Sequence, residues 1–462
     1  MKIALINPNH NLKDAAVHLG LAYLASYASS LHNNLDISLL DTRISSKRKV
    51  RKYLLNNYDL VGLTSSTQTF TEALEIALQI KELYPETPIC LGGAHASTYK
   101  EEALDANPFD FVVVGEGEQT FSDLISYLKG ELDIKLINGL IYKDLEANII
   151  ANPSRQLITD IDSIPMPSYN LFRMSAYPHH RMVSSRGCPF NCVFCNSKAI
   201  WTNRWRKRSP GKLIEEIEYL VKNFGSKTFV LNDDSFNIDA KRVNDLCGAL
   251  IARNINILWS ASARADLISR EMAQKLKSAG CYDVSIGIES ANNAVLERIN
   301  KNTTHELILS GIRNLRAAGI DVLGQFMIGN PGDTLETIKE SIDFARNSDL
   351  TGVEFYTALP YKGSSLWDFV QQHGRMLGDV EAYNYHNISP RIIFDTPEFP
   401  EKDIIKAIDL ARAYGYYNAL SKDRSIPGLN FGRKLSSLIQ QLFKGKVGNN
   451  IYLLLRKIYR KL

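Results

Sequence analysis

Short runs of β-branched and apolar residues alternate with amphipathic helical stretches along most of this 462-residue chain, and they do so in two separate series. Parallel strands joined by helices form a sheet that helices cover on both faces. The first series predicts a doubly wound, Rossmann-like α/β domain over residues 1–135, with ligands beyond the carboxyl ends of its strands. These strands are expected at residues 2–8, 36–42, 60–66, 88–94 and 109–118.

Residues 136–177 have a different character. They predict a hairpin followed by a proline-punctuated linker, IDSIPMPSYNLF. A second alternating series occupies residues 178–395 and predicts a partial, open (β/α)6 barrel, whose chemistry lies at the strand carboxyl ends. Residues 396–462 are expected to form a helical C-terminal region with a basic tail.

Three cysteines, Cys188, Cys192 and Cys195, stand within eight residues. Thiolate sulfur is a soft ligand that suits iron–sulfur clusters and zinc. Three thiolates hold three corners of a [4Fe–4S] cubane and leave the fourth iron open. A structural zinc site wants a fourth protein ligand, for which His179 and His180 are the only candidates nearby. The spacing favours the cluster, with zinc as the alternative.

The other three cysteines, Cys90, Cys247 and Cys281, are isolated in apolar surroundings and are expected to be buried, inert thiols. No uninterrupted apolar run reaches the roughly 18–20 residues of a membrane span. The N-terminus, MKIALINPNHNLKD, has too short an apolar core for a signal peptide. These features predict a cytoplasmic protein.

The segment SSRGCPFNCVFCNS follows directly on an apolar strand and resembles the signature of radical S-adenosylmethionine (SAM) enzymes. The resemblance implies that the amino and carboxylate groups of SAM chelate the open iron. It also implies that one electron cleaves the sulfonium and releases a 5′-deoxyadenosyl radical, for which an external reductant such as flavodoxin or ferredoxin is expected. In this family the backbone of the residue matching Phe194 meets the adenine.

Further matches stand at the ends of the expected barrel strands. The resemblance implies that Asp233 or Asp234, in VLNDDSF, binds the SAM amino group, and that Arg264 meets its carboxylate. The usual Gly-Gly-Glu is absent here, so the choice between the two aspartates stays open. The other implied SAM contacts are Ser285 and Glu289 in VSIGIES and Gly329 in GQFMIGNPGDT.

The segment from ICLGGAHAS to VVVGEGEQTFSDLI resembles the cobalamin-binding domain that precedes many radical SAM domains. Glycines there would let the backbone approach a corrinoid closely. The Asp-x-His-x-x-Gly motif that ligates cobalt from below is missing, which implies either cobalamin without a protein lower ligand or a domain that has lost cobalamin. The implied cobalamin contacts are Ser65, Ser66, Thr67, Gly92, Gly93, Ala94, Gly115, Glu116 and Gly117.

The combined resemblance, over roughly residues 1–380, implies a cobalamin-dependent radical SAM enzyme that transfers a methyl group to an unactivated carbon. Ring formation or rearrangement is the alternative within the family, and a non-catalytic metal-binding sensor is the alternative of another class. Eight of the 54 Lys and Arg residues lie in 431–462, so the rest has fewer basic residues than the 50 acidic ones. A nucleic-acid partner is therefore not expected.

The basic tail carries two apolar stripes at helical spacing. Either the stripes pack on the barrel, or the tail docks reversibly on an anionic membrane surface. Docking on a membrane would suit a lipid-like substrate, and packing leaves any small-molecule substrate open. The stripes are Leu435, Leu438, Ile439 and Leu442, and then Ile451, Leu454, Leu455 and Ile458.

Overall fold

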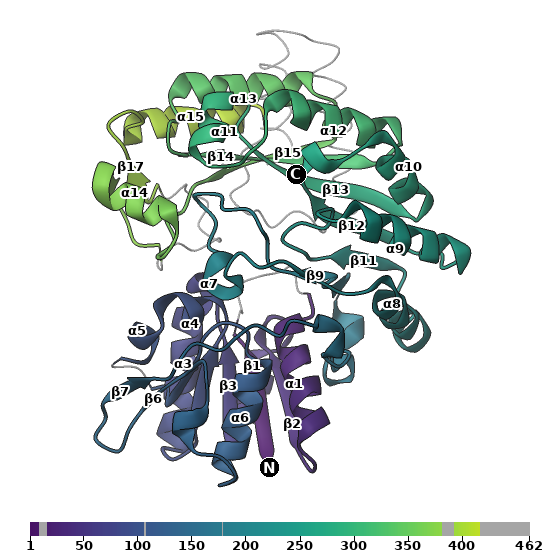
Figure 1. Cartoon of the computed structure of the whole chain (residues 1–462). Coiled ribbons are helices and arrows are strands. Elements are labelled where there is room, and N and C mark those ends of the chain that lie inside the picture. Colours follow the sequence, from purple (N-terminus) through teal and green to yellow (C-terminus); the bar gives the residue numbers. More distant parts are fainter. Residues whose placement is uncertain (9–15, 106–107, 178, 381–391, 416–462) are drawn as a thin grey trace.

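Two sheets with parallel strands organise the chain in the computed structural model, which describes residues 1–8, 16–105, 108–177, 179–380 and 392–415. Each sheet forms one of two lobes, stacked one on the other (Figure 1). The expected tail helices of residues 431–462 lie outside the described residues.

The first sheet has the strand order β2-β1-β3-β4-β5-β6-β7. Its first five strands are parallel, in the order of a flavodoxin-like doubly wound sheet, and the order reverses between β1 and β3. The prediction of this fold is confirmed. The strands are β1 (Lys2–Asn7), β2 (Asp36–Asp41), β3 (Leu60–Thr64), β4 (Ile89–Gly92), β5 (Phe111–Val113), β6 (Leu140–Lys143) and β7 (Ile149–Ala151).

Helices bury both faces of this sheet. In β1, Ile3 and Leu5 pack on the face covered by α1 and α6, and Ala4 and Ile6 pack on the opposite face. Successive side chains of a strand point to opposite faces, so a strand buried on both sides is continuously apolar. The helices are α1 (Leu19–Leu31), α2 (Lys47–Leu54), α3 (Phe70–Leu83), α4 (Ala94–Tyr99), α5 (Glu101–Leu104) and α6 (Glu118–Leu128).

Residues 136–177 pack against both lobes, whereas the sequence predicted a hairpin and a linker. The hairpin β6–β7 extends the first sheet, because β6 pairs antiparallel with β5. In and just after the proline-punctuated segment, the side chains of Tyr169, Phe172 and Met174 are buried in the core of the second lobe. This segment is therefore packed structure rather than a free spacer. The sequence prediction also missed α2, which is short and highly charged.

The second sheet has the order β15-β14-β13-β12-β11-β8, and all its strands are parallel. The two edge strands, β8 and β15, do not pair with each other, so the predicted partial (β/α)6 barrel is confirmed. Its strands are β8 (His180–Met182), β11 (Thr228–Leu231), β12 (Leu258–Ala263), β13 (Cys281–Glu289), β14 (Asp321–Ile328) and β15 (Gly352–Thr357).

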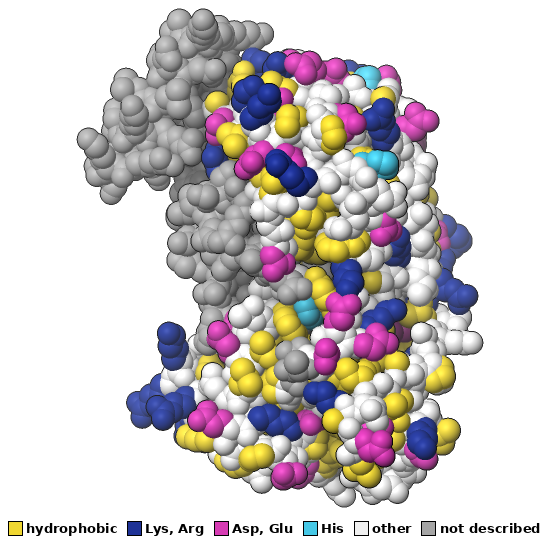
Figure 2. All heavy atoms as spheres, turned by 90° about the vertical axis from the view of Figure 1, so that its left-hand side faces the viewer, with side chains coloured by type: hydrophobic (Ala, Val, Ile, Leu, Met, Phe, Trp, Pro, Cys, Tyr) yellow, Lys and Arg dark blue, Asp and Glu magenta, His cyan; other side chains and the backbone are white. Residues whose placement is uncertain are grey.

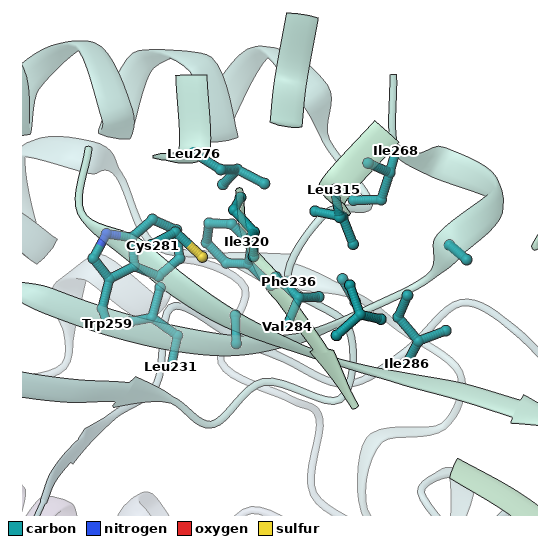
Figure 3. Packing of buried hydrophobic residues seen from close by; sticks show 14 of the residues in the cluster. Leu231, Phe236, Trp259, Ile268, Leu276, Cys281, Val284, Ile286, Leu315 and Ile320 are labelled. Atoms are coloured by element: carbon teal, nitrogen blue, oxygen red, sulfur yellow. The ribbon is translucent and has the colours of Figure 1, made fainter. Parts of the chain in front are cut away.

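A continuous apolar core fills the space between this sheet and its outer helices (Figure 3). Trp259 of β12 lies beside Cys281 of β13, and Val284 faces Leu315 of α12. The outer helices are α8 (Pro210–Phe224), α9 (Ala240–Ala252), α10 (Arg270–Ser278), α11 (Asn293–Arg298), α12 (His305–Ala317), α13 (Leu335–Asn347), α14 (Ser365–His373) and α15 (Glu401–Ala413).

Local signals fix where these helices begin and end. The Ser209 side chain caps α8 by accepting from the Lys212 N–H, Pro210 occupies the first helical position, and Gly225 ends the helix at a φ of 64°.

Acidic and basic side chains are interspersed on the face that Figure 2 presents. Among the described residues, no helix is long and apolar enough to cross a membrane.

Candidate active site

The three cysteines lie in a loop that leaves the first barrel strand. The short strands β9 (Ser185–Arg186) and β10 (Arg206–Lys207) pair at the base of this loop, which also carries the short helix α7 (Lys198–Trp201). Gly187 has a φ of 81°, and a Cβ on it would lie 2.2 Å from the carbonyl oxygen of Arg204. Only glycine fits there, because the two arms of the loop approach so closely.

Backbone hydrogen bonds fix the loop against the barrel. The N–H of Val193 donates to the carbonyl of Ile299 at 3.0 Å, and the Val193 carbonyl accepts from the N–H of Leu366 at 2.9 Å. Val193, which lies between the second and third cysteines, is therefore held by the residue that follows α11 and by the first turn of α14.

The thiols of Cys188, Cys192 and Cys195 are half-buried and free. Burial raises the pKa of the first two thiols, and raises that of Cys195 to about 11. Binding of iron therefore has to displace their protons. Among the described residues, no three His, Cys, Asp or Glu side chains converge on a site for a single metal ion.

The two aspartates after β11 differ sharply. Asp233 is fully buried, and it accepts hydrogen bonds from the Ser184 N–H at 2.6 Å and the Ser185 hydroxyl at 2.6 Å. Asp234 is exposed and accepts from the Ser197 hydroxyl at 2.7 Å, two residues after Cys195. Asp233 is thus part of the barrel wall, and Asp234 lies at the cysteine loop.

Arg264, after β12, is already committed to protein groups. Its Nε and Nη2 donate to the two carboxylate oxygens of Asp266 at 3.1 and 2.8 Å, and Nη2 also donates to the Lys301 carbonyl at 2.9 Å. The guanidinium stacks 3.9 Å from the centre of the Phe190 ring, inside the cysteine loop. Arg264 therefore orders the loop around the site.

Sequence reasoning missed Lys301, a cation at the end of β13. Its ammonium lies 2.9 Å from a carboxylate oxygen of Glu289, and both side chains are 12% exposed. Glu289 has a φ of 66° at a register shift of the strand, a strained conformation of the kind that clusters at functional sites. Ser285 shares the partly exposed side of this strand with Glu289. Lys301 stands in a loop without periodicity, so no pattern marked it.

Gly329 ends β14 at a φ of 103°, in a tight turn. The carboxylate of Asp333 accepts from the N–H groups of Gly329 at 3.0 Å and Asn330 at 2.8 Å. The side-chain oxygens of Asn330 and Thr357, at the ends of β14 and β15, are buried without a hydrogen-bond partner in the described part of the chain. Such orphaned polar atoms fit a site for a polar cofactor.

Ser65, Ser66 and Thr67 follow β3, where the strand order of the first sheet reverses. The Ser65 hydroxyl is buried and has no hydrogen-bond partner among the residues described. Gly93 has a φ of 97°, and a Cβ on it would lie 2.6 Å from the Ser65 carbonyl oxygen, whereas one on Gly92 would meet only Val113, at 4.0 Å. Gly93 therefore lets the start of α4 pack against Ser65, and this edge offers open space at Gly92 and an unused hydroxyl, which fit cobalamin.

His95 is a second residue that sequence reasoning did not select. Its imidazole is stacked between the rings of Phe70, at 3.8 Å, and Tyr99, at 4.3 Å. Burial lowers its pKa to about 4, so the ring is neutral at physiological pH. Ala94, just before it, is exposed.

Glu116 has different partners from those expected. Its carboxylate accepts from Arg186 at 2.6 Å, from Arg206 at 2.9 Å and from the N–H of Ile158 at 2.8 Å. Because its oxygens already accept these hydrogen bonds, the carboxylate has little room to accept another from a corrinoid. Gly115 and Gly117 flank it, and a Cβ on Gly115 would lie 3.8 Å from the carbonyl oxygen of Ile200 in α7. The Gly115–Glu118 loop thus faces the second lobe.

Comparison with known proteins agrees with this arrangement. Residues 182–345 match the Radical SAM superfamily, and residues 10–125 match the B12 binding domain. An uncharacterized methyltransferase of Pyrococcus horikoshii is 34% identical, over 86% of this chain and 86% of its own length. The anaerobic magnesium-protoporphyrin IX monomethyl ester cyclase of Rubrivivax gelatinosus is 31% identical, over 83% of this chain and 72% of its own length.

A solved structure has the same fold. It is that of the radical SAM methyltransferase TsrM from Kitasatospora setae with cobalamin and a [4Fe–4S] cluster bound, with a TM-score of 0.73 and 18% identity over 92% of each chain. The chain belongs to the radical SAM enzymes that carry an N-terminal B12-binding domain. It is therefore an enzyme whose cofactors are a [4Fe–4S] cluster, SAM and cobalamin, which confirms the resemblance and sets aside the sensor. Radical SAM enzymes generally act on small molecules and use an external reductant.

Proposed function

We propose that this enzyme transfers a methyl group from SAM to an unactivated carbon of a small organic substrate. One observation carries the proposal: the cysteine loop contacts the edge of the first sheet to which we assign the corrinoid. Asn196, the residue after Cys195, donates to the Thr98 hydroxyl at 2.8 Å, and Thr98 lies in α4, the helix that begins directly after Gly93. The cysteine loop and the helix that follows Gly93 are thereby held in contact.

When bound, the cluster supplies the electron that cleaves SAM, and cobalamin carries the methyl group. We assign Cys188, Cys192 and Cys195 to the cluster. We assign the SAM ammonium to Asp234, because its carboxylate is exposed beside the cysteine loop whereas that of Asp233 is buried and hydrogen-bonded. A carboxylate there makes a charge-assisted bond to the ammonium and orients the sulfonium.

We assign the SAM carboxylate and ribose to the end of β13. Arg264 is committed to Asp266, so Lys301 is the better cation for the carboxylate, while Ser285 and Glu289 offer hydrogen bonds to the ribose. The backbone of Phe194 and Gly329 would border the adenine. Glu289 would exchange its bond to Lys301 for a ribose hydroxyl when SAM binds.

For cobalamin we propose Ser65, Ser66 and Thr67 as hydrogen-bonding groups and Gly92, Gly93 and Ala94 as the backbone that the corrinoid approaches. The Asp-x-His-x-x-Gly motif that supplies a lower histidine ligand is missing from the sequence, and the Nδ1 of His18 accepts from the Leu21 N–H at 3.2 Å. A cobalt(II) spectrum with ¹⁵N-histidine in the protein is therefore expected to equal that with ¹⁴N-histidine.

Anaerobic reconstitution of the full chain with iron, sulfide, cobalamin, SAM and a reductant tests the proposal. Methyl transfer of this kind consumes two SAM molecules, so 5′-deoxyadenosine and S-adenosylhomocysteine are expected in equal amounts once a substrate is supplied. A radical enzyme that forms rings would give deoxyadenosine without S-adenosylhomocysteine. That second candidate is favoured by the identity to the Rubrivivax gelatinosus cyclase.

The basic tail is the feature of this chain that suggests a lipid-like substrate, and it lies outside the described residues. We propose peripheral contact of residues 431–462 with anionic membranes, because they hold eight cations and no acid. Full-length protein is expected to sediment with anionic but not neutral vesicles at low salt, and a chain ending at Ser425 is expected to stay in the supernatant. Equal sedimentation of both chains would contradict the membrane contact.

A further inference from the structure

The cysteine loop is bonded to the B12-binding domain on both sides of the cysteines. Arg186, two residues before Cys188, pairs with Glu116 at 2.6 Å and with Glu118 at 2.7 Å. Asn196, directly after Cys195, donates to the Thr98 hydroxyl at 2.8 Å. Figure 1 shows α7, which follows Asn196, at the junction of the two lobes beside α4.

The ion pairs that join Arg186 and Arg206 to the B12-binding domain are buried, and their positive and negative charges are equal in number. The side chains of Arg186, Glu116 and Glu118 are 8%, 4% and 6% exposed. Arg206 adds a second guanidinium, 2.9 Å from Glu116. Burial opposes the charged form of Arg186, but the carboxylates of Glu118 and Glu116 hold its pKa above the ordinary value. The Arg186 guanidinium therefore stays ionised, and its directional contacts persist at physiological pH.

Aromatic rings restrict the guanidinium further. It lies 4.8 Å from the centre of the Tyr23 ring in α1 and 5.9 Å from that of Trp201 in α7. Each lobe supplies one of these rings. Arg186 therefore has little freedom to shift without moving one lobe against the other.

The path from these contacts to the cysteines is short. Only Gly187 separates Arg186 from Cys188, and its backbone is pressed against Arg204. No residue separates Asn196 from Cys195. On the other lobe, Glu116 follows β5, and Thr98 lies in the helix that follows Gly93. Both are near the proposed corrinoid edge.

We propose that Glu116, Glu118 and Thr98 with Arg186 and Asn196 form a clamp that sets the position of the iron–sulfur cluster relative to cobalamin. The clamp rests on the proposed function. Its members are positioning residues, because their polar groups bond to one another and we assign none of them to the substrate or a cofactor. Coupling of this kind is reciprocal, so cobalamin binding also stabilises the loop around the cluster.

Two variants of the full-length, reconstituted protein test the clamp. Thr98→Val keeps the shape of the side chain and removes one hydrogen bond, and Glu116→Gln keeps the shape and removes one charge. Glu102→Gln is the matched control, because Glu102 also makes an ion pair between the lobes, but with Lys362 rather than with a residue of the cysteine loop. Circular dichroism and thermal melting report whether each variant is folded.

The first measurement is the rate at which a chelator removes iron from the reconstituted cluster, without cobalamin. We expect about fivefold faster release in Thr98→Val, the scale of one lost hydrogen bond, a larger effect in Glu116→Gln, and the wild-type rate in Glu102→Gln. Wild-type rates in folded Thr98→Val and Glu116→Gln would overturn the clamp. Because this measurement needs no corrinoid, it tests the anchoring of the cysteine loop by itself. A wild type that binds no cobalamin would overturn both the proposed function and the positioning role of the clamp, whereas wild-type release rates in the two variants would overturn the clamp alone.

The second measurement is the dipolar coupling between the reduced cluster and cob(II)alamin in the loaded protein. A single narrow distance is expected for the wild type and Glu102→Gln, and a broadened or displaced distribution for the two clamp variants. A role in stability alone would lower the melting temperature and leave this distance unchanged, so unchanged distances would also overturn the proposal.

Discussion

Asp233 and Asp234 are adjacent in sequence, yet their carboxylates lie in opposite environments. That of Asp233 is buried in the barrel wall and bonded to Ser184 and Ser185, and that of Asp234 is exposed and bonded to Ser197. Asp233 thus belongs to the barrel wall, and Asp234 is the aspartate that we propose to bind SAM.

Replacing each aspartate separately tests this division. Asp234→Asn is expected to weaken SAM binding by about tenfold, because a charge-assisted bond becomes a neutral one, with an unchanged unfolding midpoint. Asp233→Asn is expected to cost about 1–3 kcal/mol of unfolding free energy, because it disturbs a buried acceptor. Equilibrium dialysis with SAM and urea unfolding measure the two effects. The reverse pattern would show that the assignment is wrong.

Each cluster cysteine is expected to be indispensable. Cys188→Ala, Cys192→Ala and Cys195→Ala each remove one corner ligand, so iron content falls and 5′-deoxyadenosine formation is lost. Cys90→Ala, a change at a buried thiol of β4, is the control and is expected to keep both. Full deoxyadenosine production by any one of the three would refute the cluster assignment.

Gly93→Ala is expected to abolish corrinoid binding, measured as visible absorption that stays with the protein through gel filtration. The new Cβ would lie 2.6 Å from the Ser65 carbonyl, so the edge of the sheet must shift. Gly130→Ala is the control, since Gly130 also has a positive φ, of 75°, but has open space around it. Equal corrinoid binding by the two variants would remove the reason for placing cobalamin at Gly93.

Because of Asp333, the free energy of unfolding is expected to fall as the pH rises. Burial raises its pKa from 3.8 to about 7, although N–H groups of Asn330 and Gly329 and the Thr337 hydroxyl donate to it. The folded protein binds this proton more tightly than the unfolded chain does, so protonation of Asp333 adds to the free energy of unfolding. This stabilisation is complete below about pH 4 and is lost as pH rises through 7. Asp333→Asn resembles the protonated form at every pH. Its urea midpoint is expected to fall less between pH 5 and pH 8 than that of the wild type, and equal falls would argue against the raised pKa.

Much of the architecture followed from the sequence alone. Buried strands are continuously apolar, and their helices carry apolar faces at helical spacing, so periodicity marked the elements of both lobes. The cysteine triad was equally visible, because its chemistry depends on spacing within eight residues. Such features are local, and local spacing is what a sequence specifies directly.

The partners of the charged residues were decided only by the tertiary structure. Glu116 meets Arg186 across 70 residues, and Asp233 meets Ser184 across 49. Lys301 reaches Glu289 from a loop that has no periodicity. A charged side chain can satisfy itself with water, a neighbour or a distant partner, and only packing determines which it finds. The sequence by itself thus determined most of the elements and the spacing of the cysteine triad, and the packed lobes decided which charged side chains are already paired within the protein.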